Sequence, residues 1–211
     1  MAENPRRHPY FWERHIDADG AWRRSGPTAK SERPTGEELA ALRRGIGREA
    51  GTVPELWPYY ETENPDHLGR RGLVSDGLVA EHIALSLYGL HQQSQEKPMH
   101  KPGRGLGTAV RRLRGRDAFS ADAIDRRFNA AATSSTQHEL TLHLRSLVTL
   151  LRGQEIALDY TQVVEDLARW SWDDGRSRTR RRWGSDYFGW SKPATDEETT
   201  DSPSDTATAV H

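Results

Sequence analysis

Apolar positions recur at helical spacing through most of the chain, most clearly in residues 138–152. The leucines of this segment are four, three and four residues apart: Leu140, Leu144, Leu147 and Leu151. That spacing places them on one stripe of an α-helix. Gly153 follows, and glycine accepts the left-handed conformation that often ends a helix. The pattern therefore predicts a long amphipathic helix that ends near residue 152.

A second helix is predicted to begin at Asp159. Its carboxylate can accept the free N–H groups of the first turn, and Gln162 stands at the matching capping-box position. The apolar face that follows has four members: Val163, Val164, Leu167 and Trp170. Because the link to the preceding helix is short, we expect the two helices to form an antiparallel pair.

Four further helices are predicted upstream. Thr35 and Glu38 fit a capping box, and Ser75 can cap a helix that is apolar on nearly all sides and so is expected at the centre of a bundle. A stripe with helical spacing begins at Leu106. Ser120 lies between two apolar residues that fit a hydrophobic staple.

Irregular segments separate these helices. Residues 94–105 have the composition of a linker, 130–136 that of a loop of small residues, and 173–175 that of a turn. After that turn, aromatic residues interleave with arginines, and we expect them to seal the last helix onto the bundle: Trp183, Tyr187 and Phe188.

The predicted fold is all-α, with four segments. Residues 1–34 form an irregular leader that its aromatic cluster orders in part. Residues 35–103 form a small N-terminal helical bundle, and residues 104–190 a basic C-terminal bundle. Residues 191–211 contain almost no apolar side chains and are predicted to be a disordered acidic tail.

Composition narrows the class of protein. The chain has 211 residues, 34% of them hydrophobic, and no cysteine, which excludes disulfides and thiolate metal sites and fits a cytoplasmic location. No apolar run approaches the roughly 20 residues needed to cross a bilayer, so no membrane partner is expected. The net charge of −1 is unevenly divided: residues 104–190 hold 15 Arg and 11 Asp or Glu, whereas the tail holds one Lys and five acids. A basic face suits a polyanionic partner.

Arginines stand off the predicted apolar stripes on several helices. Any one of them is more simply a solvated surface charge, but together they make a candidate nucleic-acid-binding set: Arg44, Arg48, Arg111, Arg112, Arg126, Arg127, Arg145, Arg152, Arg176, Arg178 and Arg181. Backbone phosphates are the groups that scattered arginines contact, without reading sequence.

Signals for catalysis, metals and cofactors are weak. Gly103, Gly105 and Gly107 could open a phosphate-binding helix start, but no strand precedes them as a dinucleotide fold requires. His82 and His91 are nine residues apart without a completing carboxylate, so packed or solvated histidines are the simpler interpretation. We predict no enzyme activity, no catalytic residue, no metal, no cofactor and no small-molecule substrate.

The order of several short motifs resembles the CasB family, the small subunit of the type I-E CRISPR surveillance complex Cascade. The resemblance covers residues 35–190. Its motifs in chain order are Leu42-Arg43-Arg44, Val53-Pro54-Glu55-Leu56, residues 85–93, Gly105-Leu106-Gly107, residues 143–148, Leu158-Asp159-Tyr160, residues 166–170, Trp183 and Tyr187-Phe188.

The resemblance implies a function and a set of partners. Members are all-helical, lack catalytic activity, and sit as two head-to-tail copies against the backbone and large subunits of Cascade. Their basic face helps hold the guide RNA, the target DNA and the displaced strand of the R-loop in antiviral defence.

The family's basic positions map onto part of the candidate set: Arg44, Arg111, Arg126, Arg127, Arg145, Arg176 and Arg178. The surrounding residues fix the register of Arg145 best. Members often carry a second basic residue directly after it, and here Ser146 stands there.

Two other functions stay open. Short basic helices with glycine turns also occur in helix-turn-helix DNA-binding regulators, although no compact recognition helix stands out. A purely structural helical adaptor, whose arginines meet acidic partner surfaces, is the second alternative. Charge reversal at Arg145 and Arg127 separates the adaptor from the nucleic-acid-binding subunit, because an adaptor would lose assembly rather than R-loop stability.

Overall fold

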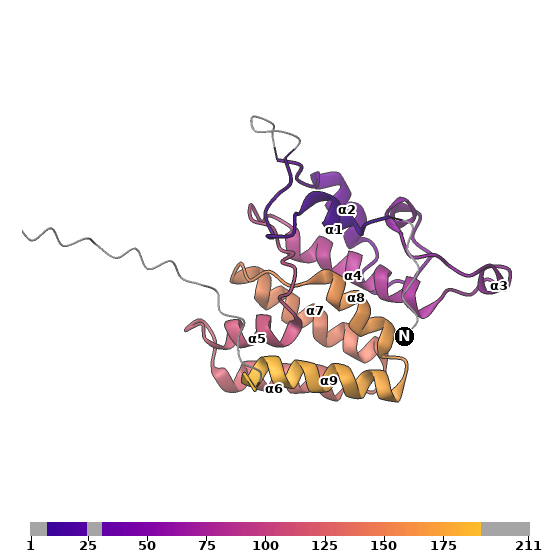
Figure 1. Ribbon diagram of the computed structural model, residues 1–211. Coiled ribbons are helices and arrows are strands. Elements are labelled where there is room, and N and C mark those ends of the chain that lie inside the picture. Colours follow the sequence, from indigo (N-terminus) through magenta and orange to yellow (C-terminus); the bar gives the residue numbers. More distant parts are fainter. Residues whose placement is uncertain (1–7, 25–30, 191–211) are drawn as a thin grey trace, which may run out of the picture.

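The computed structural model describes residues 8–24 and 31–190, and helices make up most of this part of the chain (Figure 1). In the described residues, extended pairing is limited to isolated bridges, so the all-α prediction is confirmed. The elements in order are α1 Phe11–His15, α2 Gly36–Arg43, the 3₁₀ helix η1 Pro54–Tyr59, α3 Asp66–Gly69, α4 Asp76–Gln92, α5 Leu106–Arg114, α6 Ala121–Thr133, α7 Gln137–Gly153, α8 Tyr160–Arg169 and α9 Asp173–Phe188.

Side chains cap the predicted helix starts. Thr35, Ser75, Ser120 and Asp159 each accept a hydrogen bond from the backbone N–H three residues later, at 3.1–3.2 Å. The predicted capping box of Thr35 with Glu38 is also present. A cap of this kind contributes about 1 kcal/mol, and it fixes where each helix begins.

The leucine stripe of α7 is buried as predicted, and α4 packs against both α7 and α8. We expected α7 and α8 to form a direct antiparallel pair. They meet at one end, where Gln137 Nε2 donates to the Leu167 carbonyl oxygen at 3.1 Å, but their main common neighbour is α4. The apolar circumference of α4 explains this arrangement, since it offers two helices a surface at once.

Part of the leader belongs to the core. Trp12 in α1 is fully buried, its ring lies 5.6–5.8 Å from the rings of Tyr88 and Tyr160, and its Nε1 donates to Thr161 Oγ1 at 3.0 Å. The aromatic cluster thus orders this part of the leader. Two isolated bridges hold the irregular described residues beyond α1.

One hydrophobic cluster contains buried residues from both halves of the chain. It runs from the leader through α4 and α5 to α9, and Figure 1 shows α4 lying alongside the orange helices of the C-terminal half. The boundary between two bundles at residues 103 and 104 stays a prediction. The predicted acidic tail, 191–211, lies outside the described residues.

Three local predictions were wrong. The expected turn at 173–175 is the first turn of α9, where Asp173 and Asp174 favour the positive end of the helix dipole. Residues 130–133 continue α6 because the alanines there are strong helix formers. Phe188 was expected to seal α9, but it is 62% exposed, whereas Trp183 and Tyr187 are buried.

Candidate nucleic-acid interface

Two of the candidate arginines are paired with carboxylates. Arg44 forms an ion pair with Glu55, and Arg176 forms one with Asp173 at the start of its own helix. Arg176 also donates to the Ser135 carbonyl oxygen at 3.1 Å, so it fastens α9 to the junction of α6 and α7. These two guanidiniums are the least suited to take a phosphate.

Two more candidates donate to neutral groups. Arg127 donates to the carbonyl oxygen of Ala123, one turn back on α6, at 3.0 Å. Arg152 is half-buried, and its Nη1 lies 3.3 Å from Gln93 Oε1 and 3.4 Å from the Leu90 carbonyl oxygen. Arg152 thus joins the ends of α7 and α4. Its charge is not neutralised, but part of its hydrogen-bonding fork is occupied.

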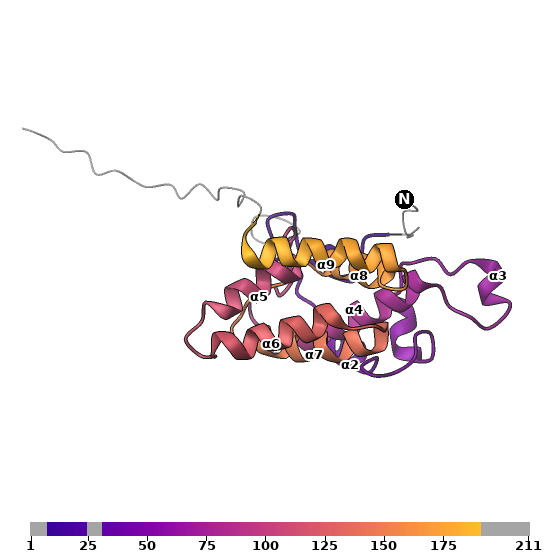
Figure 2. The same ribbon diagram turned by 90° about the horizontal axis from the view of Figure 1, so that it is seen from below.

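Seven candidates are exposed and form no ion pair within residues 8–24 and 31–190: Arg48, Arg111, Arg112, Arg126, Arg145, Arg178 and Arg181. The structure brings only some of them together. Figure 2 shows α9 in one layer and α6 and α7 in the other, so the helices that carry these arginines lie in different layers of the fold.

Arg48 and Arg145 line one cavity of about 390 Å³, which we call the α4–α7 cleft. Its walls are the turn 45–50, one side of α4 and one side of α7. Arg48 comes from the N-terminal half and Arg145 from the C-terminal half, and Ile83 and Leu142 add apolar surface. The arrangement gives two cations beside a partly apolar trough, which the Glu49 side chain also lines.

A buried histidine holds the turn that carries Arg48. His82 Nε2 lies 3.0 Å from the carbonyl oxygens of both Gly45 and Arg48, and its Nδ1 lies 2.7 Å from the Tyr60 hydroxyl oxygen. Burial lowers the pKa of His82, so the ring is neutral near pH 7; Nε2–H donates to the carbonyls and Nδ1 accepts from Tyr60. His82 therefore positions this turn. The spacing of histidines in the sequence could not show that role.

The densest arginine cluster, 176–182, is partly structural. Arg182 pairs with Asp166, a buried carboxylate that also accepts from Trp183 Nε1 at 2.8 Å. Arg180 donates to the Ser134 carbonyl oxygen at 2.9 Å and lies over the Trp170 ring at 5.4 Å. Within this cluster, the exposed Arg178 and Arg181 are the arginines that a nucleic-acid partner can reach.

Gly105 and Gly107, at the start of α5, serve packing. A Cβ on Gly107 would lie 2.4 Å from the Trp183 carbonyl oxygen, and one on Gly105 would lie 2.0 Å from Gln162 Oε1. Because α5 approaches α9 so closely, the helix start is covered by neighbouring elements. The suggestion that these glycines open a phosphate site is not supported by this geometry.

We expect Gly107→Ala to lower the free energy of unfolding by about 1–3 kcal/mol, since α5 and α9 must move apart. Gly153→Ala is the control, because a Cβ there meets no atom within 4 Å. Urea denaturation measures both variants. Equal stability of the two would show that α5 does not pack as described.

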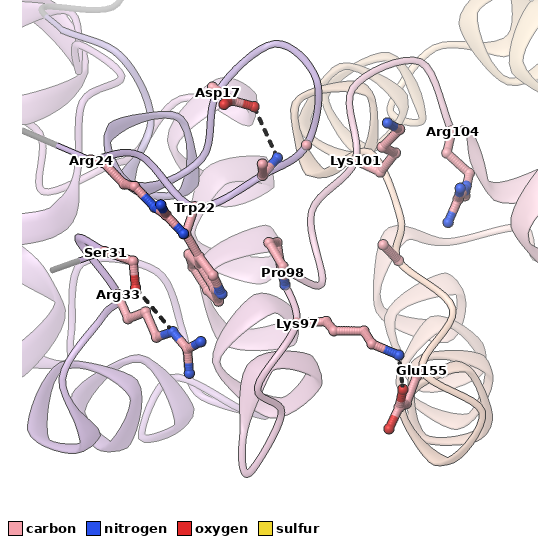
Figure 3. A pocket seen from close by; sticks show the side chains of 13 residues that line it. Asp17, Trp22, Arg24, Ser31, Arg33, Lys97, Pro98, Lys101, Arg104 and Glu155 are labelled. Atoms are coloured by element: carbon pink, nitrogen blue, oxygen red, sulfur yellow. Dashed lines mark hydrogen bonds and ion pairs between the residues drawn. The ribbon is translucent and has the colours of Figure 1, made fainter. Parts of the chain in front are cut away.

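A second basic cavity was missed by the sequence analysis. It has a volume of about 820 Å³ and lies between the leader and the segment 97–104 (Figure 3). Its lysines and arginines are Arg24, Arg33, Lys97, Lys101 and Arg104. Two features of the sequence pointed to it: the leader has more basic than acidic residues, and the linker contains lysines. These segments are about 75 residues apart, so the sequence did not show that they meet.

No group of three or more metal-ligating side chains occurs in the part of the chain that the structure describes. His82 and His91 are both buried, and His91 Nδ1 lies 2.9 Å from the Tyr160 hydroxyl oxygen. Among the described helices, none is long and apolar enough to cross a membrane.

A protein-family model described as CRISPR-associated protein Cse2 matches residues 38–188. The chain belongs to the Cse2 family. Among solved structures, it is similar to CasB from Thermobifida fusca, with 32% identity, a TM-score of 0.55, and coverage of 72% of this chain and 84% of that one. This confirms the CasB resemblance seen in the sequence motifs.

Two more distant structures share the fold of this Cse2-family chain. M. ruber CasB is 23% identical, with a TM-score of 0.56 and coverage of 75% of this chain and 87% of that one. A chain titled "CRISPR RNA-guided surveillance complex" is 22% identical, with a TM-score of 0.53 and coverage of 74% and 83%. No curated protein sequence matches the chain.

Proposed function

We propose that this chain is the small, non-catalytic subunit of a CRISPR RNA-guided surveillance complex. Membership of the Cse2 family supports this assignment, and so does the shared fold with a chain from such a complex. The partners are then the guide RNA, the target DNA, the backbone and large subunits of Cascade, and a second copy of this chain.

In this role the subunit binds the phosphates of the nucleic-acid backbone and thereby stabilises the R-loop. The observation that carries the proposal is that Arg48 and Arg145 line the same α4–α7 cleft, with no carboxylate paired to either among the described residues. Guanidiniums that contact phosphates position a strand without reading its sequence. Guide pairing supplies the sequence information in complexes of this kind.

The test uses the assembled complex with guide RNA and a target duplex. The cleft variant carries Arg48→Gln and Arg145→Gln. The control variant carries Arg70→Gln and Arg71→Gln, two exposed arginines directly after α3, which projects away from the bundle in Figure 1. Both variants lose two positive charges, so a general effect of net charge is matched.

We expect the cleft variant to assemble normally but to release target DNA at least about tenfold faster at 0.1 M salt. The slope of the logarithm of target affinity against the logarithm of salt concentration should be shallower by roughly 1.4. The control variant should behave as the wild type. Unchanged target retention in the cleft variant would contradict the proposal. Failure to assemble would instead indicate the adaptor role, in which these arginines meet acidic protein surfaces.

A further inference from the structure

The cavity between the leader and the segment 97–104, here called the leader–linker cleft, has walls fixed by backbone pairing. Ile16 pairs with Trp22, and Arg24 pairs with Ser31. On the opposite side, the Lys101 N–H donates to the Leu158 carbonyl oxygen at 3.2 Å. The bridges thus fold the leader wall back on itself, and the hydrogen bond ties the other wall to the residue before Asp159.

Lys101 ties the two walls together. Its Nζ donates to the Asp19 carbonyl oxygen, a contact that spans 82 residues of sequence. A Cβ on Gly20, which has a φ of +75°, would lie 2.5 Å from Lys101 Cδ. The lysine is thus held at the base of the leader–linker cleft, with a neutral carbonyl as its partner.

The leader–linker cleft has an excess of positive charge. Lys97 is neutralised by Glu155 at 2.8 Å, and the Asp17 carboxylate accepts N–H groups of its own turn at 2.9–3.0 Å. Arg33 Nε donates to Ser31 Oγ at 3.2 Å, which leaves its charge uncompensated. Arg24 is exposed and forms no ion pair in the described chain. Arg24, Arg33 and Lys101 therefore line this volume with no carboxylate partner among the residues that the structure describes.

An aromatic ring lies among these cations. The half-buried Trp22 donates from Nε1 to the Glu96 carbonyl oxygen at 2.8 Å, which fixes the ring plane. The Arg33 guanidinium lies 5.8 Å from the ring centroid. Figure 3 shows Trp22 between Arg24, Arg33 and Pro98 on the wall of the cavity. Flat indole and guanidinium surfaces are the groups on which bases of single strands stack.

We propose that the leader–linker cleft binds single-stranded nucleic acid, with a base on the Trp22–Arg33 platform and phosphates at Arg24, Arg33 and Lys101. A duplex hides the faces of its bases, so it cannot use the ring. An acidic peptide would use the charges but has no flat base to stack on Trp22. The volume of about 820 Å³ is within the range of roughly 300–1,000 Å³ typical of ligand pockets, so it holds a short stretch of a strand.

The inference adds a second contact to the proposed function and rests on it for the source of the strand. It concerns residues that lie mostly outside the matched family segment 38–188. The α4–α7 cleft and the leader–linker cleft have no lining residue in common, so variants of one leave the other intact.

The test measures binding of a fluorescent 15-nucleotide oligo(dT) to the full-length chain at 0.1 M salt. The leader variant, Arg24→Gln with Arg33→Gln, is compared with the control variant at residues 70 and 71. For single strands, affinity varies as salt to the power of about −0.7 per phosphate contact, which gives roughly fivefold per contact at 0.1 M. We expect the leader variant to bind roughly 25-fold more weakly, with unchanged melting temperature, and the control variant to bind as the wild type.

A second measurement reports on Trp22. An oligonucleotide with one 2-aminopurine should lose fluorescence when that base stacks on the ring, and Trp22→Leu should abolish this quenching. Binding by the leader variant within twofold of the control would overturn the inference, as would no binding by the wild type up to about 100 µM. Selective loss of polyglutamate binding, with oligonucleotide binding kept, would overturn it in favour of an acidic peptide. Target release by the variant with Arg48→Gln and Arg145→Gln is measured separately in the complex. The proposed function can therefore stand when this inference fails.

Discussion

Trp12→Ala is expected to lower the free energy of unfolding by about 3–5 kcal/mol. The indole is fully buried, contacts the rings of Tyr88 and Tyr160, and donates to Thr161 Oγ1. Its removal leaves a large cavity where α1, α4 and α8 meet, because the surrounding helices cannot collapse around alanine. Urea denaturation followed by circular dichroism measures the loss.

Trp172→Ala is the matched control. Trp172 is 57% exposed in the turn before α9, and its indole forms no hydrogen bond within the described part of the chain. Its removal should change stability by no more than about 0.5 kcal/mol. Equal effects of the two substitutions would mean that the leader does not pack into the core.

The sequence predicted helices where two local signals coincide. At Thr35, Ser75, Ser120 and Asp159, a capping side chain precedes an apolar stripe, and each of these helices begins where expected. Both signals act within about four residues, so one sequence is enough to show them. By contrast, α1 is five residues long, too short for a period to emerge. Its stability comes from contacts with distant segments.

The same limit applies to the arginines. Helical periodicity places Arg111 and Arg145 off the apolar stripes, and both are exposed. Periodicity does not show which partner an arginine meets across space: Arg182 reaches Asp166 on α8, and Arg176 reaches Ser135. The exposure of these arginines could thus be predicted from the sequence. Which guanidiniums form ion pairs or hydrogen bonds with distant residues could be seen only in the tertiary structure.

The two cavities show why sites are harder to predict than helices. The α4–α7 cleft needs a turn of the N-terminal half beside α7, and the leader–linker cleft needs two segments joined through Lys101. Neither of these contacts between distant segments produces a periodic pattern in the sequence. Residues 1–30 hold six basic and four acidic residues, but such a count gives no position for any charge.

Stability is expected to fall steeply between pH 6.5 and pH 5, because buried histidines must stay neutral in the fold: His82, and with the larger shifts His91 and His100. Burial lowers the pKa of His91 to about 3 and that of His100 to about 4, the latter despite the opposing charges of Asp159 and Glu13. The unfolded chain, with a histidine pKa of about 6.5, takes up these protons first. Each histidine therefore contributes stability that is complete above about pH 6.5 and is lost as the pH falls toward its folded pKa.

At pH 5 the loss is about 2 kcal/mol for each of His91 and His100, or about 4 kcal/mol together, at about 1.4 kcal/mol per pH unit per proton. Urea denaturation at intervals from pH 7.5 to pH 5 measures it. The carboxyls of Glu139 and Glu155 have lowered pKa values, so they remain ionised in this window and do not account for the slope. His91→Asn should remove about 2 kcal/mol of this pH-dependent loss, whatever its effect at neutral pH. A free energy of unfolding that is flat across the window would contradict the neutral, buried state of both rings.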